Sequence, residues 1–319
     1  MKYAKLGRTG CEVSRLCLGT MNFGALTSEE DSFRIMDEAL DMGINFFDTA
    51  NGYAGGLTES IIGRWLAQGD GRRERVVLAT KVWTRMGDGP NRNPGLSAYK
   101  IKRELEESLQ RLQTDHIDLY QMHYIDRSAT WEEKWGAMED LVRAGKVFYV
   151  GSSNHAGWDI ARAQGFARAR GFLGLVCEQH HYNLLWRDAE REVFPACKCE
   201  GLGVITYSPI GGGLLGGNVS DPEKGARSDS EYIRGLLEKY RGQIEEYEAF
   251  CEELGESPAV VAVAWQLANP VITSPIVGPR KLDHLTSMSR AVELELDAQA
   301  LERLESIFPG PGQYMIDRN

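Results

Sequence analysis

Residues 76–123 read VVLATKVWTRMGDGPNRNPGLSAYKIKRELEESLQRLQTDHIDLYQMH, and this stretch decides the fold. Its two ends, Val76–Lys81 and Ile117–His123, are short apolar runs that predict buried strands. Between them lies a segment with the period of a helix. Its apolar stripe consists of Ile101, Leu105, Leu109 and Leu112. Its opposite face is expected to be in contact with solvent and carries Lys102, Arg103, Glu106 and Glu107. A strand, a helix and a second strand in this order predict a parallel βαβ unit.

The same alternation extends in both directions along the chain. The predicted strands are Arg15–Gly19, Ile44–Asp48, Val76–Lys81, Ile117–His123, Val147–Ser152, Leu175–Gln179, Val204–Tyr207 and Val271–Val277. Eight βα units without a break in composition favour a closed (β/α)8 TIM barrel, with residues 1–319 as a single domain. An open doubly wound sheet is the alternative fold.

Helix boundaries carry local signals. Ser28 and Thr130 are each followed three residues later by an acidic residue, which predicts a capping box, and Ala144-Gly145 predicts a helix end.

Two segments depart from the regular alternation of strands and helices. The short polar start before Arg15 is expected to form a hairpin that closes the barrel bottom. Residues 211–240, Gly-rich and then charged, are expected to form a long loop after the seventh strand, either a lid over a ligand or a surface excursion.

Composition excludes several classes of function. The chain has 36 Lys and Arg against 46 Asp and Glu, a net charge of −10, which argues against nucleic acid as a partner. Its longest apolar run, Ala259–Trp265, is far shorter than the roughly 20 residues of a membrane helix. No apolar stretch of signal-peptide length opens the chain, so a cytoplasmic location is expected. Cys197 and Cys199 lack metal-site spacing, and His180 and His181 alternate across a strand, so no metal is expected.

Polar residues end three consecutive predicted strands. Asp48, Lys81 and His123 follow buried runs, and Tyr53 lies in the loop after Asp48. In a barrel these ends converge, and an unpaired buried charge is unfavourable, so Asp48 and Lys81 are expected to pair. The cation is expected to lower the pKa of Tyr53 and make it a general acid. Taken singly, the pair is an ordinary salt bridge and His123 a core histidine; together the four residues form a proton-transfer device.

These residues and their neighbours resemble the aldo-keto reductases. The resemblance spans nearly the whole chain and rests on Gly19-Thr20-Met21, Asn45-Phe46-Phe47-Asp48-Thr49-Ala50 with Tyr53, Thr80-Lys81, Met122-His123, Gly151-Ser152-Ser153-Asn154, Tyr207-Ser208-Pro209 and Val277-Gly278-Pro279-Arg280. It implies an NADPH-dependent reductase of aldehydes or ketones. Tyr53 would protonate the carbonyl oxygen, Lys81 would lower the phenol pKa, Asp48 would hold Lys81, and His123 would orient the carbonyl.

The resemblance also implies how a nicotinamide dinucleotide binds. Ser153, Asn154 and Gln179 would hold the nicotinamide, Tyr207 would stack on it, and Arg280 would bind a 2′-phosphate, which favours NADPH over NADH. The remaining expected cofactor contacts are Gly19, Thr20, Met21, Asp48, Ser208, Pro209, Ile210, Gly211, Gly212, Leu214, Asn218, Arg227, Gly278 and His284. His284 and Met288 stand where many relatives place a Gln and an Asn, and Met288 cannot hydrogen-bond adenine as an amide would.

Aromatic residues near the strand ends are expected to line a substrate pocket: Trp83, Tyr124 and Trp186. The substrate is therefore predicted to be a small carbonyl compound with some apolar area. Two alternatives come from other classes. One is a nicotinamide-binding sensor or channel-type auxiliary subunit, as some relatives with this fold are; His123 argues against it, because such relatives often lack the histidine. The other is a Schiff-base lyase that uses Lys81, which pairing with Asp48 would keep protonated and a poor nucleophile.

Overall fold

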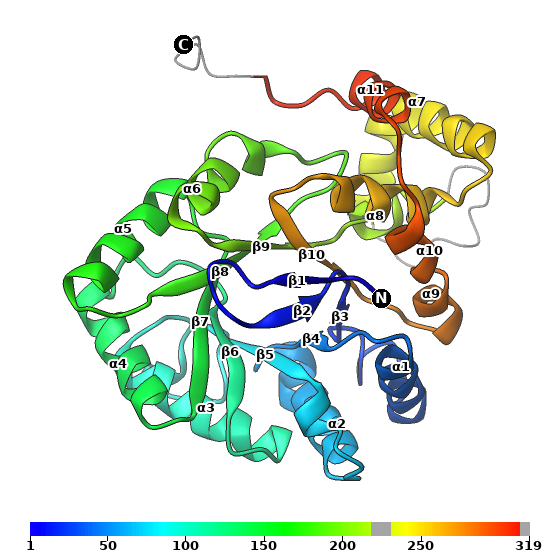
Figure 1. Cartoon of the computed structure of the whole chain (residues 1–319). Helices are drawn as coiled ribbons and strands as arrows, with labels where there is room; N and C mark the ends of the chain where they lie inside the picture. The colour runs from blue at the N-terminus through cyan, green and yellow to red at the C-terminus, as the bar shows by residue number, and fades with distance from the viewer. Residues whose placement is uncertain (218–230, 313–319) are drawn as a thin grey trace.

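Parallel strands close into a barrel in the computed structural model, which describes residues 1–217 and 231–312 (Figure 1). The strand order is β10-β3-β4-β5-β6-β7-β8-β9. These barrel strands are β3 (Cys17–Gly19), β4 (Phe46–Asp48), β5 (Val77–Val82), β6 (Ile117–Met122), β7 (Val147–Ser153), β8 (Leu175–His181), β9 (Gly203–Tyr207) and β10 (Ile272–Val277). The barrel closes where Ile276 of β10 pairs with Cys17 of β3. The predicted TIM barrel is confirmed, and the open sheet is wrong.

Helices surround the barrel (Figure 1). They are α1 (Glu29–Asp41), α2 (Leu57–Leu66), α3 (Ala98–Leu112), α4 (Trp131–Arg143), α5 (Gly157–Ala169), α6 (Val193–Glu200), α7 (Glu231–Leu254), α8 (Pro258–Ala268), α9 (Leu282–Thr286), α10 (Ser289–Glu293) and α11 (Ala298–Ile307). The predicted N-caps and the helix end are confirmed: the hydroxyls of Ser28 and Thr130 accept from the amides of Asp31 and Glu133, and Gly145 follows α4 with φ of 71°. The return bond of a capping box is replaced, since Asp31 accepts from the Ser28 hydroxyl and Glu133 from the amide of Ala98. Among the described helices, none is long and apolar enough to cross a membrane.

The strand predictions differ from the structure mainly at their ends. The strands β3 and β4 begin two residues later than predicted. The backbone amides of Arg15 and Asn45 donate to the carbonyl oxygen of Lys2 and to the Ser14 hydroxyl, and so bond to the N-terminal hairpin segment instead of a neighbouring barrel strand. At the other end, β8 continues to His181. Every predicted strand nevertheless overlaps one barrel strand, so the carboxyl ends that matter for the site are placed as expected.

The predicted hairpin at the barrel bottom is present. β1 (Tyr3–Lys5) pairs antiparallel with β2 (Glu12–Ser14), and this hairpin crosses in front of the barrel in Figure 1. The side chains of Leu6 and Val13 are fully buried in the cluster that fills the barrel. Gly7 has φ of 57°, and a Cβ there would lie 2.4 Å from the carbonyl oxygen of Val176. Glycine therefore lets the hairpin lie directly against the strands.

The barrel interior changes from apolar to polar along the strands. Its lower layers are apolar, with Cys17, Phe46, Ala79, Leu119, Cys177, Ile205 and Ile276. Side chains of a strand point to the same face every second residue, so the next inward positions are two residues further on. On β4, β5, β6 and β8 these positions are Asp48, Lys81, Gln121 and Gln179. The apolar layers support a polar layer at the carboxyl end of the barrel.

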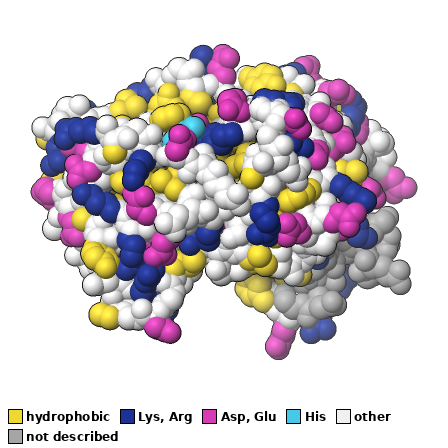
Figure 2. All heavy atoms as spheres, turned by 90° about the horizontal axis from the view of Figure 1, so that it is seen from below, with side chains coloured by type: hydrophobic (Ala, Val, Ile, Leu, Met, Phe, Trp, Pro, Cys, Tyr) yellow, Lys and Arg dark blue, Asp and Glu magenta, His cyan; other side chains and the backbone are white. Residues whose placement is uncertain are grey.

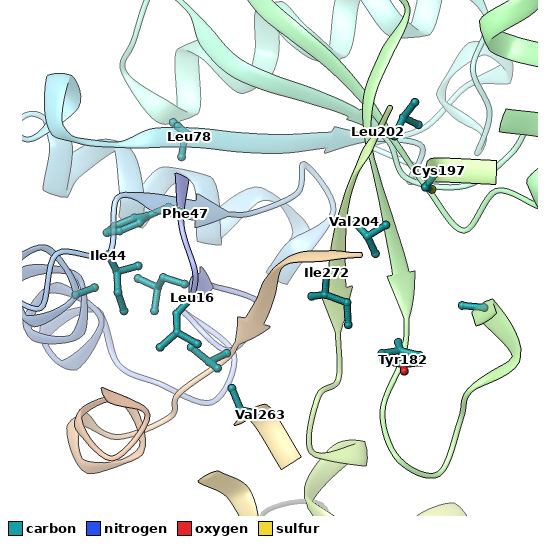
Figure 3. Packing of buried hydrophobic residues seen from close by; sticks show 14 of the residues in the cluster. Leu16, Ile44, Phe47, Leu78, Tyr182, Cys197, Leu202, Val204, Val263 and Ile272 are labelled. Atoms are coloured by element: carbon teal, nitrogen blue, oxygen red, sulfur yellow. The ribbon is translucent and has the colours of Figure 1, made fainter. Parts of the chain in front are cut away.

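Outside the barrel, the strands pack against the helices. Phe47 of β4 stacks on Trp65 of α2, with ring centroids 5.6 Å apart. Figure 3 shows other members of this outer core, including Leu78 of β5 and Val263 of α8. On the surface, ion pairs such as Lys102–Asp140 join neighbouring helices. Basic and acidic side chains are interspersed over the face shown in Figure 2.

The expected long loop at residues 211–240 is shorter than predicted. Gly211–Gly213 form a 3-10 turn after β9, and residues 231–240 already belong to α7. This helix contacts α8 and α11 (Figure 1). Its buried side chains, Ile244, Tyr247, Phe250 and Cys251, lie in its second half, where α8 and α11 cover it. The helix start was missed although Ile233, Leu236, Leu237 and Tyr240 recur at helical spacing in its first half. Residues 218–230 lie outside the described ranges.

Gly63→Ala is expected to lower the free energy of unfolding by about 1–3 kcal/mol, because a Cβ at Gly63 of α2 would lie 2.1 Å from the carbonyl oxygen of Arg111. Alanine's better helix propensity recovers only about 1 kcal/mol. The matched control is Gly136→Ala in α4, where a Cβ meets no atom within 4 Å. The control should be stabilised in urea unfolding, and equal stabilisation of Gly63→Ala would contradict the close contact of α2 with α3.

Candidate active site

Asp48, Lys81 and Tyr53 are in direct contact at the carboxyl end of the barrel. Asp48 ends β4, Lys81 lies in β5, and Tyr53 opens the 3-10 turn Tyr53–Gly56 that follows β4. The Lys81 Nζ lies 2.5 Å from Asp48 Oδ1 and 3.2 Å from the Tyr53 hydroxyl. Lys81 is fully buried, and Asp48 is 2% exposed. The predicted pairing of Asp48 with Lys81 is confirmed.

All three protons of the Lys81 ammonium have an acceptor. Besides Asp48 Oδ1 and the Tyr53 oxygen, Lys81 donates to the carbonyl oxygen of Thr49 at 2.9 Å. Burial alone would lower the pKa of Lys81, but the charge of Asp48 and the hydrogen bonds to Asp48 and Tyr53 outweigh it and raise the pKa. Lys81 is therefore a cation. Because the Tyr53 oxygen accepts from Lys81, the proton of Tyr53 is directed away from Lys81.

The pKa of Tyr53 moves opposite to the direction predicted from sequence. Burial raises it, and the charge of Lys81 lowers it by less, so the net shift is upward. The expected decrease rested on the Lys81 charge alone. The increase comes from desolvation of the Tyr53 phenol, which depends on the packing around the turn that follows β4. Tyr53 is consequently a protonated phenol over the neutral pH range. The following residue, Ala54, has φ of 47°, a strained conformation that turns the chain sharply after Tyr53.

His123 follows β6 and lies beside Tyr53. Their ring centroids are 6.1 Å apart and the rings meet edge to face. Burial and the charge of Lys81 lower the pKa of His123 to about 3, so the imidazole is neutral. Its buried Nδ1 has no hydrogen-bond partner among the described residues. The four side chains predicted to act together are thus brought together, with a neutral imidazole and a neutral phenol around one ion pair.

Two glutamines complete the surroundings of Asp48. Gln121 Nε2 and Gln179 Nε2 donate to Asp48 Oδ2 at 2.9 and 2.8 Å. Gln179 was expected to hold a nicotinamide, and its amide nitrogen is instead directed at Asp48. Gln121 was missed by the sequence analysis. A signal existed, since Gln121 is two residues beyond Leu119, the same step that leads from Ala79 to Lys81.

The predicted cofactor residues lie at the same end of the barrel. Gly19 ends β3, Ser153 ends β7, Tyr207 ends β9, and Gly278 follows β10. The Thr20 hydroxyl donates to the carbonyl oxygen of Asp48, whereas Met21 is exposed. Pro209 is buried, and Ile210 and Leu214 flank the turn Gly211–Gly213. Asn218 and Arg227 lie outside the described residues.

A chain of hydrogen bonds links three of these strand ends. Tyr207 donates its hydroxyl proton to Asn154 Oδ1 at 2.8 Å, and Asn154 Nδ2 donates to the carbonyl oxygen of His123 at 3.1 Å. Asn154 and Ser208 have φ of 58° and 56°, which is uncommon for residues other than glycine. Such strain is typical of functional sites.

Positive φ values mark the glycine turn after β9. Gly211, Gly212 and Gly213 have φ of 59°, 68° and 108°. The amides of Gly211 and Gly213 donate to the carbonyl oxygens of Ser208 and Ile210, so these two amides do not point at a phosphate site. Arg280 lies just before α9, which begins at Leu282 after the extended N-cap residue Lys281. His284 lies inside α9, and burial lowers its pKa.

The predicted substrate residues form two groups. Tyr124 stacks on His123, with centroids 4.9 Å apart, and Trp83 lies 5.8 Å from Tyr124. Trp186 belongs to a second group, with its ring centroid 5.0 Å from that of His181, which in turn stacks on Tyr207. Tyr124 therefore contacts the His123 imidazole and Trp83 contacts Tyr124, whereas Trp186 is linked through His181 to Tyr207, an expected nicotinamide contact.

Comparisons with known proteins show the family of the chain. The model of the Aldo/keto reductase family matches residues 15–308. The chain therefore belongs to the aldo/keto reductase family and is an oxidoreductase. It is 58% identical to "Uncharacterized oxidoreductase YrpG" of Bacillus subtilis, over 98% of this chain and 97% of the relative. It is 32% identical to a putative aryl-alcohol dehydrogenase of Schizosaccharomyces pombe (95% and 94% covered) and 31% identical to versiconal hemiacetal acetate reductase of Aspergillus parasiticus (96% of each).

Proposed function

We propose that this protein is an NADPH-dependent reductase that converts an aldehyde or ketone to an alcohol. The observation that carries the proposal is the Tyr53 hydroxyl held by the Lys81 ammonium, which is itself paired with Asp48. A protonated phenol with its proton directed away from the lysine is a general acid for a carbonyl oxygen. When bound, the nicotinamide would supply the hydride for the carbonyl carbon.

Each residue of the cluster has a distinct role in this proposal. Tyr53 gives its proton to the carbonyl oxygen as negative charge develops there. Lys81 stabilises the resulting phenolate, because its ammonium already donates to that oxygen. Neutral His123 donates a hydrogen bond to the same carbonyl oxygen and orients it. Asp48 keeps Lys81 charged and in place.

The residues present fit a nicotinamide dinucleotide. The amide side chain of Asn154 offers a hydrogen bond and the ring of Tyr207 a stacking surface. The turn Gly211–Gly213 carries no side chains and lets a pyrophosphate approach the backbone closely. Arg280 supplies a guanidinium, whose planar donors suit a 2′-phosphate. The other proposed contacts are Gly19, Thr20, Met21, Ser153, Gln179, Ser208, Pro209, Ile210, Leu214, Asn218, Arg227, Gly278 and His284. Trp83, Tyr124 and Trp186 are the proposed substrate contacts.

The direct test follows NADPH consumption with a panel of aromatic and aliphatic aldehydes and quantifies the alcohol formed. We expect one alcohol for each NADPH oxidised. Tight NADPH binding without carbonyl-dependent consumption across the panel would overturn the reductase and favour a nicotinamide-binding sensor. Borohydride trapping of a carbonyl compound on Lys81 would instead favour a Schiff-base enzyme.

Arg280→Met is expected to weaken NADPH binding by about 10- to 100-fold, as loss of a hydrogen-bonded ion pair with a phosphate does. NADH lacks the 2′-phosphate, so its affinity should change little. Titrating the intrinsic tryptophan fluorescence with each cofactor measures both constants. An equal loss of affinity for NADPH and NADH would contradict the assignment of Arg280 to the 2′-phosphate.

The pH profile of kcat/KM is expected to show no acidic limb near pH 6.5, where an ordinary histidine titrates. The pKa of His123 is about 3, so the imidazole stays neutral as the pH falls through this range. At high pH, activity should be lost as Tyr53 gives up its proton, at a pH that burial raises. Initial rates between about pH 5 and about pH 11.5 measure the profile, since the alkaline limb lies above the ordinary phenol pKa of about 10. A limb near pH 6.5 that disappears in His123→Gln would contradict a neutral His123.

A further inference from the structure

Asp48 Oδ2 is held by two side-chain amides that have no part in the proton transfer described above. Gln121 Nε2 and Gln179 Nε2 both donate to it, and Gln179 Nε2 also lies 3.3 Å from Gln121 Oε1. Gln121 is fully buried, and Gln179 is 3% exposed. The two oxygens of the Asp48 carboxylate therefore have different partners: Oδ1 accepts from Lys81, and Oδ2 accepts from the two amides.

The barrel provides space for the Gln121 side chain. In the strand register, Gln121 pairs with Lys81 on one side and with Gly151 on the other. A Cβ on Gly151 would lie 3.2 Å from Gln121 Cγ and 2.7 Å from Cys177 Sγ. The absent side chain at position 151 leaves room in which Gln121 reaches across the barrel to Asp48.

The separate partners of the two Asp48 oxygens determine where the Lys81 ammonium points. Neutral N–H donors favour the ionised form of a carboxyl group and fix its plane. Without them, Asp48 Oδ2 would be a buried acceptor lacking a donor, and Asp48 would be free to turn both oxygens toward Lys81. Lys81 would then move toward Asp48 and away from the Tyr53 hydroxyl, which is already the longest of its three contacts.

We propose that Gln121, together with Gln179, is a positioning residue that orients ionised Asp48 and so keeps the Lys81 ammonium on Tyr53. The kinetic part of this inference rests on the proposed reductase function. Gln121 is the residue to test, because Gln179 is also an expected cofactor contact and its replacement would confound binding with positioning.

Gln121→Met keeps the length of the side chain and removes the donor. We expect kcat to fall on the order of tenfold, as for the loss of one hydrogen bond to a charged group. KM for the aldehyde and the NADPH dissociation constant should stay unchanged, since Gln121 is fully buried and acts through Asp48. The alkaline limb of kcat should move to higher pH, because a more distant Lys81 lowers the pKa of Tyr53 less. An unchanged kcat would overturn the proposal.

Gln121→Glu gives a signature that a packing role would not. At low pH the new carboxyl is protonated and can donate to Asp48 Oδ2, so activity should approach that of wild type. As the pH rises it ionises beside Asp48, and activity should fall through an ionisation that wild type lacks. Loss of activity to the same extent at every pH in both variants would show that Gln121 only fills space.

A mutant cycle measured by urea unfolding tests the contact between Gln121 and Asp48 without any measurement of activity. Gln121→Met is compared in wild type and in an Asp48→Leu/Lys81→Met background, where the carboxylate is absent. We expect a lower urea midpoint in wild type and an unchanged or higher midpoint in the apolar background, where the buried Gln121 amide has lost its acceptor. Equal losses in both would overturn the contact between Gln121 and Asp48. If wild type turned over no aldehyde, the reductase proposal would fail, and this cycle would still decide the role of Gln121.

Discussion

Tyr53→Phe is expected to lower kcat for aldehyde reduction by a factor of about 10²–10⁴, the usual contribution of a positioned general acid. The change removes only the hydroxyl, which lies 3.2 Å from Lys81 Nζ. The aromatic ring remains against His123, so the shape of the site should be kept. NADPH binding, followed by tryptophan fluorescence, should match wild type, so the loss belongs to the chemical step.

The matched control is Tyr232→Phe, which removes a phenol from an exposed side chain of α7. Its kcat should equal that of wild type. A Tyr53→Phe enzyme that retained more than about a tenth of wild-type kcat would mean that another group protonates the carbonyl oxygen.

Asp48→Leu is expected to lower the free energy of unfolding by about 3–5 kcal/mol, because it leaves the Lys81 charge buried without its counter-ion. Asp48→Leu/Lys81→Met, which removes both charges, should recover most of that loss. Both variants should lack reductase activity. Urea unfolding of the three proteins measures the effect, and the double variant distinguishes a buried charge from lost packing.

An exposed ion pair provides the comparison. Lys102 and Asp140 join α3 and α4 at 2.5 Å, but about half of each side chain is exposed. Asp140→Ala should leave the urea midpoint nearly unchanged, since exposed pairs contribute little. If Asp48→Leu were as mild as Asp140→Ala, Lys81 would have to be neutral in the folded protein, which contradicts its role in holding Tyr53.

The sequence predicts most of the fold because the barrel strands are buried on both faces. Runs such as Val76–Lys81 and Val147–Ser152 therefore begin with four consecutive apolar residues, and helices of the barrel carry caps such as Ser28. The start of α7 was not predicted, because the charged and Gly-rich composition of residues 211–240 was interpreted as a loop. The half-buried residues Ile233, Leu236, Leu237 and Tyr240 have helical spacing and are the local signal of that helix.

For the candidate site, the sequence predicts which residues meet but not all of their physical states. Asp48, Lys81 and His123 end neighbouring strands, so their convergence follows from the barrel. The pKa of Tyr53 depends on how deeply the turn after β4 packs, which spacing along the chain does not encode. Gln121 escaped notice because a lone glutamine inside an apolar strand resembles an ordinary strand residue until the barrel register is known.

The most direct test of the account titrates wild type and Tyr53→Phe with NADPH by tryptophan fluorescence and then adds 4-nitrobenzaldehyde to the same cuvette. We expect both proteins to bind NADPH with the same affinity and only wild type to consume it. Binding by both proteins with consumption by neither, or with equal consumption by both, would contradict the claim that Tyr53 is the general acid of a carbonyl reductase.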